Sequence, residues 1–221
     1  DVNFRDLDLM LLGPAVNQAS AIFDQYWNSQ AVVPIDALNP QSQAELDRLL
    51  LRLERESRLS QAAPYLARVR QRITLPAVRQ SHRLQWSAGI AVVADPPLKH
   101  RNSPRQDWLV TRIIADLGSA AERMQLISPY FVPGQDGNQA LIAMRRQGIA
   151  IELVTNSLAA TDVAAVHSGW KRYRQPLLEA GVEVFELKRR GHRAGIAVPF
   201  GSSAASLHTK AYLVDGRRGF V

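Results

Sequence analysis

The sequence predicts an α/β fold in which a mostly parallel β-sheet is flanked by helices. Apolar strands alternate with amphipathic helices along the second half of the chain, at a spacing that suits right-handed crossovers between parallel strands. A hairpin signal, Asp215–Gly216, comes after the last apolar strand. The chain has 221 residues, which is enough for one large domain or two small ones with a core in each.

The N-terminal segment predicts one strand followed by one helix. Residues 4–12 first alternate polar and apolar side chains and then become wholly apolar, which is typical of a strand that enters a core and ends at Gly13. Pro14 suits the first turn of a helix, because its missing N–H does no harm there. Apolar side chains then recur at three- and four-residue steps as far as Trp27, so we expect a helix with one apolar face.

The middle of the chain predicts a connector, a charged helical region and a second strand. Residues 33–39 form the connector, and residues 41–72 are helical and highly charged. We expect their leucine stripe to pack on a core while the charges face solvent. The stripe comprises Leu46, Leu49, Leu50 and Leu53. Residues 85–94 predict a strand that ends at two consecutive prolines, and the basic residues 99–105 then mark a boundary between two halves.

The elements of the second half define a sheet edge at which ligands are expected to bind. We expect strands over residues 124–128, 149–154 and 182–187, and helices over residues 108–121, 138–147 and 162–180. Ligands collect at the carboxyl ends of parallel strands, which here are residues 128–130, residues 155–157 and the loop of residues 188–206. The basic side chains of that loop indicate contact with phosphate or a membrane surface, although a solvated loop explains them equally well.

The residues that carry chemistry lie near the end of the chain, as His208, Lys210 and Asp215 in the pattern His-x-Lys-x-x-x-x-Asp. Residues two apart on a strand share a face, so His208 and Lys210 are expected to project side by side. A neutral imidazole can act as nucleophile or proton donor, and a lysine ammonium supplies a point charge for phosphate oxygens. The pair therefore indicates attack on a phosphodiester. Asp215 faces the opposite side of an ideal strand, so it can stabilise the turn instead of contacting substrate.

Composition limits the remaining function classes. The sequence has no Cys, which excludes disulfides and thiolate metal sites, and its five His are scattered without metal-ligand spacing. The net charge of +7 favours an anionic partner. No apolar run is long enough to span a membrane, and the first residues do not form a signal peptide. Both ends look cut, so we expect the sequence to be part of a longer protein.

Several segments resemble the cardiolipin synthase branch of the phospholipase D superfamily. They are the motif itself, Ser-Pro-Tyr-Phe-x-Pro at residues 128–133, Asn-Ser-Leu at residues 156–158, and the Gly-Ser-Ser that begins at residue 201. Residues 6–16 resemble the family's segment just after a first copy of the motif, and that first copy is not in this sequence. The resemblance implies a phospholipase D-like α/β/α sandwich. Residues 1–97 would be the C-terminal part of a first lobe with a helical insert, and residues 98–221 a second lobe that stops within the motif hairpin.

The resemblance also implies the residues of the site. His208, Lys210 and Asp215 would be the second copy of the catalytic motif, which meets the first copy at one site and reacts through a phosphohistidine. Tyr130, Asn156 and His167 would bind substrate, although His167 lies between apolar residues of a helix and can equally have a buried packing role. The family requires no cofactor and no metal.

The implied activity is the synthesis of cardiolipin from phosphatidylglycerol and a second phospholipid, for which phosphatidylethanolamine is one candidate. The other expected partners are an anionic membrane surface and the half of the same enzyme that carries the first motif; nucleic acid is not expected. The expected location is the cytoplasmic side of a bacterial inner membrane, peripheral or anchored by parts outside this sequence. Two alternatives stay open: a phospholipase D-type phosphodiesterase or nuclease, and a non-catalytic lobe that binds anionic membrane.

Overall fold

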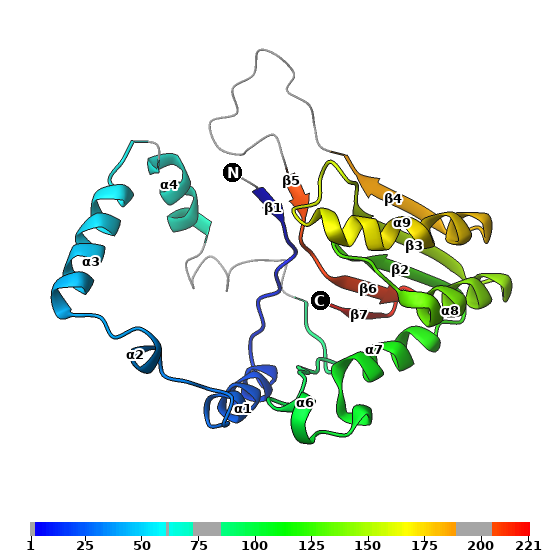
Figure 1. Ribbon diagram of the computed structural model, residues 1–221, viewed down its shortest axis with the longest axis horizontal. Coiled ribbons are helices and arrows are strands. Elements are labelled where there is room, and N and C mark those ends of the chain that lie inside the picture. Colours follow the sequence, from blue (N-terminus) through cyan, green and yellow to red (C-terminus); the bar gives the residue numbers. More distant parts are fainter. Residues whose placement is uncertain (1–2, 61, 73–84, 189–204) are drawn as a thin grey trace, which may run out of the picture. The chain divides into compact units, whose positions relative to one another are not determined.

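The computed structural model describes residues 3–60, 62–72, 85–188 and 205–221 (Figure 1). The chain forms two compact units. One comprises Asp1–Leu11 with Arg105–Val221, and the other comprises Leu12–Pro104. The assignment of residues 1–97 and 98–221 to two lobes of a larger enzyme stays a prediction. None of the described helices is both long enough and apolar enough to cross a membrane.

The unit that contains the motif is built on a five-stranded sheet with the order β4–β3–β2–β6–β7. Its three consecutive strands β2 (Arg123–Ile127), β3 (Ala150–Asn156) and β4 (Glu183–Leu187) are parallel, as predicted. The strand β6 (Ala211–Val214) is antiparallel to β2, and β7 (Arg218–Phe220) is antiparallel to β6. The predicted class, an α/β fold with a parallel-dominated sheet flanked by helices, is therefore confirmed.

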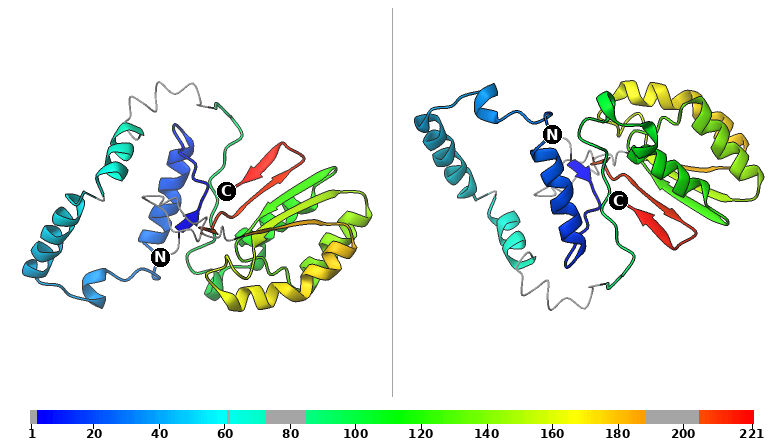
Figure 2. Two further views of the ribbon diagram at one scale, coloured as in Figure 1. Left: turned by 90° about the horizontal axis from the view of Figure 1, so that it is seen from above. Right: turned by 90° about the horizontal axis from the view of Figure 1, so that it is seen from below.

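Two crossover helices cover one face of this sheet (Figure 2). The helix α8 (Gly134–Arg146) connects β2 to β3, and α9 (Ala164–Glu179) connects β3 to β4. Successive right-handed crossovers that step in one direction place their helices on the same side. The helix α8 begins at Gly134, four residues earlier than predicted. A further helix, α7 (Leu109–Gly118), precedes β2.

The core of this unit lies between the sheet and these helices. Along β3 the side chains of Ile151 and Leu153 are almost fully buried, and their neighbours on the strand are partly exposed. Trp170 of α9 is 1% exposed and packs edge-on against Phe131, with ring centroids 5.4 Å apart. Full burial of such side chains contributes about 1.5–3 kcal/mol each. This packing stabilises the sheet that includes β6, the strand that follows His208 and Lys210.

The motif segment departs from the predicted continuous strand. The strand β5 (Ala205–Leu207) pairs in parallel with β1 (Asn3–Arg5), whereas β6 pairs with β2. The chain passes from one sheet to the other between these pairings, so residues 208–210 form an extended link instead of strand. The predicted strand over residues 4–12 is likewise confined to its beginning, because the described structure offers residues 6–12 no neighbouring strand.

The hairpin after the motif forms as predicted. Asp215 has φ +51° and Gly216 has φ +64°, and a type I′ turn requires positive φ at both central residues. The turn leads directly into β7. Most of the predicted basic loop lies outside the described residues, which resume at residue 205.

The second unit is helical, with α1 (Ala15–Trp27), α2 (Ile35–Leu38), α3 (Gln43–Ser57), α4 (Ala63–Arg72) and α6 (Lys99–Asn102). The helix α1 agrees with the prediction from Pro14 to Trp27. The predicted helical region of residues 41–72 is two helices, and the first begins at a capping box in which Ser42 and Glu45 bind each other's backbone N–H groups.

Two predictions for this unit are wrong. Residues 85–94 do not form a strand, and the Val92 N–H donates to the side chain of Gln18 instead of a neighbouring strand. The leucine stripe of α3 is not packed on a core, because each of its members is 42–54% exposed. The periodicity correctly predicted an amphipathic helix, but periodicity does not specify what covers the apolar face.

Candidate active site

The backbone of the motif is held against β1. The His208 N–H donates to the Arg5 carbonyl oxygen at 2.9 Å, and the Thr209 N–H donates to the same oxygen at 3.2 Å. The Thr209 hydroxyl is a third donor to that oxygen, also at 3.2 Å. Thr209 is buried between His208 and Lys210, which are more exposed. The peptide on either side of the imidazole is therefore fixed by main-chain bonds.

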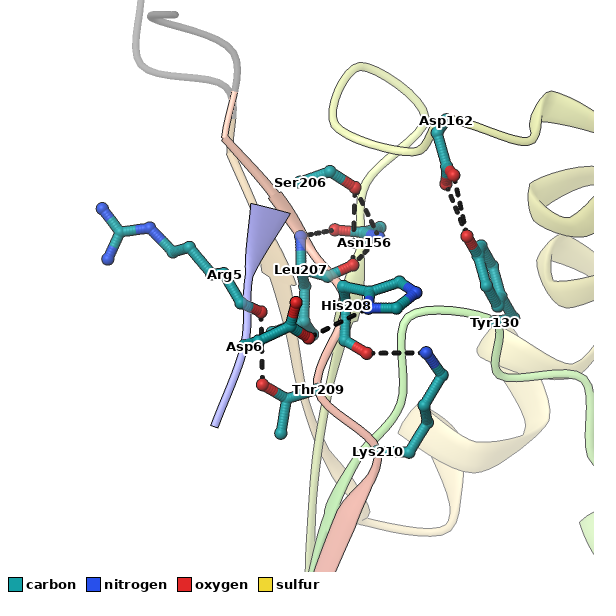
Figure 3. Close-up of polar contacts among 10 residues, drawn as sticks. All are labelled: Arg5, Asp6, Tyr130, Asn156, Asp162, Ser206, Leu207, His208, Thr209 and Lys210. Atoms are coloured by element: carbon teal, nitrogen blue, oxygen red, sulfur yellow. Dashed lines mark hydrogen bonds and ion pairs between the residues drawn. The ribbon is translucent and has the colours of Figure 1, made fainter. Parts of the chain in front are cut away.

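The imidazole of His208 has a carboxylate partner, Asp6. The His208 Nδ1 atom lies 2.9 Å from Oδ1 of Asp6, and both side chains are about two-fifths exposed (Figure 3). A carboxylate in this position holds the proton on Nδ1 and leaves the lone pair of Nε2 free. The Phe4 ring, whose centroid lies 5.0 Å from that of the imidazole, supports the same side chain.

The ammonium group of Lys210 lies beside this imidazole. Its Nζ donates to the His208 carbonyl oxygen at 2.8 Å and lies 5.7 Å from the centre of the Tyr130 ring. Figure 3 shows His208, Lys210 and Tyr130 in one group, although Tyr130 comes from the loop after β2. The structure therefore brings together three of the six residues predicted for the site.

The phenol of Tyr130 is oriented by Asp162. The Tyr130 hydroxyl donates to the two Asp162 carboxylate oxygens, at 2.8 and 3.0 Å. This hydrogen bond raises the pKa of Tyr130 above its ordinary value, and partial burial and the nearby negative charge act in the same direction. The phenol is therefore neutral at ordinary pH. Its ring faces the ammonium group of Lys210.

A cavity of about 470 Å³ opens beside His208 and Lys210, and Tyr130 is not part of its lining. His208, Lys210 and Asp6 line it together with apolar groups. Its full lining is Asp6, Leu7, Asp8, His208, Thr209, Lys210, Phe220 and Val221. The lining includes two carboxylates, those of Asp6 and Asp8, beside one imidazole, one cation and an apolar wall. Because Asp6 binds the imidazole, an anionic group with apolar substituents would be held at Lys210.

Comparisons with known proteins identify the relatives of this chain. The chain is 34% identical over 233 residues to cardiolipin synthase C of Escherichia coli (strain K12), a match that covers 99% of this chain and 47% of that protein. Residues 113–221 match the family described as cardiolipin synthase, PLD-like domain. The chain belongs to the cardiolipin synthase branch of the phospholipase D superfamily.

Two further relatives are less similar to this chain. A cardiolipin synthase of Geobacillus thermodenitrificans (strain NG80-2) is 30% identical over 115 residues, which are 51% of this chain and 20% of that protein. An uncharacterized protein of Helicobacter pylori (strain ATCC 700392 / 26695) is 26% identical over 221 residues, or 97% of this chain and 43% of that protein. The chain spans about half the length of the curated relatives that it matches from end to end.

Asp215, the third residue of the phospholipase D motif, lies at the far end of β6 from His208. Its carboxylate accepts hydrogen bonds from three backbone N–H groups that lead into β2, those of Ala121, Glu122 and Arg123, at 2.9–3.0 Å. These bonds lower the pKa of Asp215 to about 2. They support the alternative that Asp215 stabilises the turn, and a direct catalytic role for it stays a prediction.

The remaining two predicted substrate-binding residues are buried. Asn156 is 2% exposed, and its amide binds the backbone of Leu207. His167 is 8% exposed within α9, and among the described residues its Nδ1 has no hydrogen-bond partner. Neither residue lines the cavity. Substrate binding by these two residues stays a prediction, and the burial of His167 favours its packing alternative.

One residue of the site, Asp6, was not predicted from the sequence. Its signal there is the Asp-x-Asp pattern at residues 6–8, which carries a family resemblance but does not indicate a partner for either carboxylate. Asp6 and His208 are 202 residues apart, and nothing local in either segment indicates that they meet. The parallel pairing of β1 with β5 brings them together.

Proposed function

We propose that this chain is part of a phospholipase D-type phosphatidyltransferase that makes cardiolipin from phosphatidylglycerol and a second phospholipid. The observation that carries the proposal is the arrangement of Asp6, His208 and Lys210 on one cavity. The match to cardiolipin synthase C supports the choice of substrate class. The chain supplies one motif histidine, so the proposal includes a second, from a further copy of the motif in a longer protein.

The proposed reaction has two steps. In the first, Nε2 of one motif histidine forms a bond to phosphorus, and the bond from phosphorus to the headgroup oxygen breaks. The other motif histidine gives its proton to the departing alcohol, which leaves a phosphohistidine. In the second step the hydroxyl group of phosphatidylglycerol loses its proton to that second histidine and attacks phosphorus. The N–P bond then breaks, and the first imidazole is regenerated. His208 takes one of these two roles.

The residues around His208 serve this chemistry by charge and position. Asp6 keeps the proton on Nδ1, so that Nε2 has the lone pair that a nucleophile needs, and it stabilises the positive imidazole of the acid form. The ammonium group of Lys210 lies where it can stabilise the negative charge that grows on the non-bridging phosphate oxygens. The apolar side chains of Leu7, Phe220 and Val221 suit the glycerol backbone and upper acyl carbons of a phospholipid.

The proposal includes peripheral association with the cytoplasmic side of a bacterial inner membrane. The net charge of +7 supports attraction to anionic lipid headgroups. Both proposed substrates are membrane lipids, so a chain that binds the bilayer surface reaches them without extracting them into water.

The test is an assay of the full-length protein that the proposal assumes. The protein is given phosphatidylglycerol in detergent micelles, with and without phosphatidylethanolamine. The lipid products are then distinguished by their masses. Cardiolipin that forms in the intact protein and not in a His208→Ala variant is the expected result. Phosphatidic acid as the sole product would instead identify a hydrolase of the same superfamily. No reaction with any phospholipid, by a folded protein, would contradict the proposal.

A further inference from the structure

The side chain of Asn156 binds the residue that directly precedes His208. Asn156 is the last residue of β3, and its Oδ1 accepts a hydrogen bond from the Leu207 N–H at 2.9 Å. Its Nδ2 donates to the Leu207 carbonyl oxygen at 3.0 Å and to the Ser206 hydroxyl oxygen at 3.2 Å. Figure 3 shows these bonds next to His208. Both polar atoms of the amide are therefore engaged with the motif segment.

The chemistry of the amide suits this position. One carboxamide presents an acceptor and a donor together, which match the N–H and C=O groups of a single residue. Two strands exchange the same pair of bonds in an antiparallel ladder. Asn156 is 2% exposed and Ser206 is fully buried, so water cannot replace these bonds when they are lost. The Asn156 side chain therefore makes to Leu207 the two hydrogen bonds that a further residue of a neighbouring strand would make.

This contact links two sheets that share no backbone ladder in the described part of the chain. His208 follows β5, which pairs with β1, whereas Lys210 precedes β6, which belongs to the five-stranded sheet. The carbonyl oxygen of Arg5 holds the backbone of residues 208 and 209 from the β1 side. The amide of Asn156 holds residue 207 from the β3 side. The imidazole is therefore placed by contacts from two directions.

We infer that Asn156 is a positioning residue, which sets the place of the His208 imidazole relative to Lys210 and Tyr130 by holding the peptide of Leu207. The inference rests on the proposed function in treating His208 as the catalytic residue. It differs from the sequence prediction, in which Asn156 contacted substrate. A displacement of about 1 Å in a reacting group can reduce a rate on the order of 10²-fold.

The first experiment separates kcat from KM in the full-length protein. In Asn156→Ala we expect kcat to fall on the order of 10²-fold while KM changes by less than about threefold, because the substrate contacts remain. Asn156→Ser, which keeps a small polar group, should lie between this variant and the wild type. The control is Leu153→Ala, which removes a buried side chain of the same strand away from the motif. Rates are normalised to folded protein measured by near-ultraviolet circular dichroism.

The second experiment does not depend on activity. The ¹⁵N shifts of labelled histidine, assigned with a His208→Gln variant, report which ring nitrogen of His208 carries the proton. The wild type should hold the Nδ1–H form through Asp6, and Asn156→Ala or Asn156→Ser should move the ring toward the Nε2–H form. Leu153→Ala should keep the wild-type form. If the asparagine variants keep it too, or if their kcat matches that of the control, the inference is overturned. An inactive wild type would contradict the proposed function. In that case the ¹⁵N measurement of the His208 tautomer would still test whether Asn156 positions the imidazole.

Discussion

The Nδ1 atom of His208 lies 2.9 Å from Oδ1 of Asp6, across 202 residues of sequence. The two side chains meet because β1 and β5 are parallel neighbours, with Arg5 opposite Leu207 in the register. Asp6 and His208 directly follow these two strands and therefore lie side by side. A short two-stranded sheet therefore forms the carboxylate–imidazole pair.

The first prediction concerns this pair. Asp6→Asn in the full-length protein keeps the shape of the side chain but removes the charge that stabilises the imidazolium form. It should lower kcat on the order of 10²–10⁴-fold, because His208 loses the carboxylate that orients it for acid–base or nucleophilic catalysis. The measurement is steady-state transfer with phosphatidylglycerol in micelles.

Asp107→Asn is the control for this loss of one charge, because Asp107 is exposed in the short 3-10 helix before α7. It should have wild-type kcat. Equal rates for Asp6→Asn and this control would mean that Asp6 does not act on His208.

The second prediction concerns His208 and Lys210. His208→Ala removes the nucleophile or its acid–base partner and should lower kcat at least on the order of 10²–10⁴-fold. Lys210→Ala removes the cation that lies beside the imidazole, and Lys210→Arg should also be poor, because a planar guanidinium does not occupy the place of a compact ammonium. Near-wild-type turnover by folded His208→Ala would show that this segment is not catalytic.

The third prediction separates the role of Asp215 from that of His208. Asp215→Asn should lower the melting temperature, with a much smaller effect on kcat than His208→Ala. The pKa of Asp215 is lowered from 3.8 to about 2 in the folded protein, so its stabilising contribution is present above pH 3.8 and is lost as the pH falls through about 2. The difference in melting temperature between wild type and variant should therefore be largest near neutral pH and shrink below pH 3.8.

Gly216→Ala is the matched control in the same turn. It is destabilising because Gly216 has φ +64°, and this strain does not depend on protonation. Its shift in melting temperature should stay constant over the acid range in which the Asp215→Asn shift shrinks. A constant shift for both variants would contradict the role assigned to the Asp215 carboxylate.

The sequence predicted the elements whose signal lies within one short segment of the chain. The parallel strands could be predicted from β2 to β4, because each is a short apolar run between helices that Gly148 and Gly181 terminate. The turn at Asp215 could be predicted because its geometry requires positive φ. The contacts of Asp6 and Asn156 with the motif could not, since each joins segments that no local pattern connects. The prediction of a strand over residues 85–94 was wrong for the same reason. A strand needs a partner strand, which its own sequence does not specify.

The fourth prediction concerns the number of motifs. The proposed chemistry uses two histidines, and this chain contains one copy of the motif. A verified monomer of residues 1–221 should therefore show negligible transfer or hydrolysis, measured against the full-length protein at equal molar concentration. Turnover by that monomer at a comparable rate would exclude a mechanism with two motif histidines.

The fifth prediction concerns the membrane. The net charge of +7 should give binding to vesicles that contain anionic lipid. Exposed charges are screened beyond a Debye length of roughly 8 Å at physiological ionic strength, so binding should fall steeply as salt is added. Cosedimentation of the chain with vesicles of phosphatidylglycerol and phosphatidylcholine, from low to high salt, measures this dependence, and pure phosphatidylcholine vesicles are the control. Equal binding to both kinds of vesicle at low salt would mean that charge does not direct the chain to the membrane. The apolar wall of the cavity, or the exposed leucines of α3, would then be the surfaces to test next.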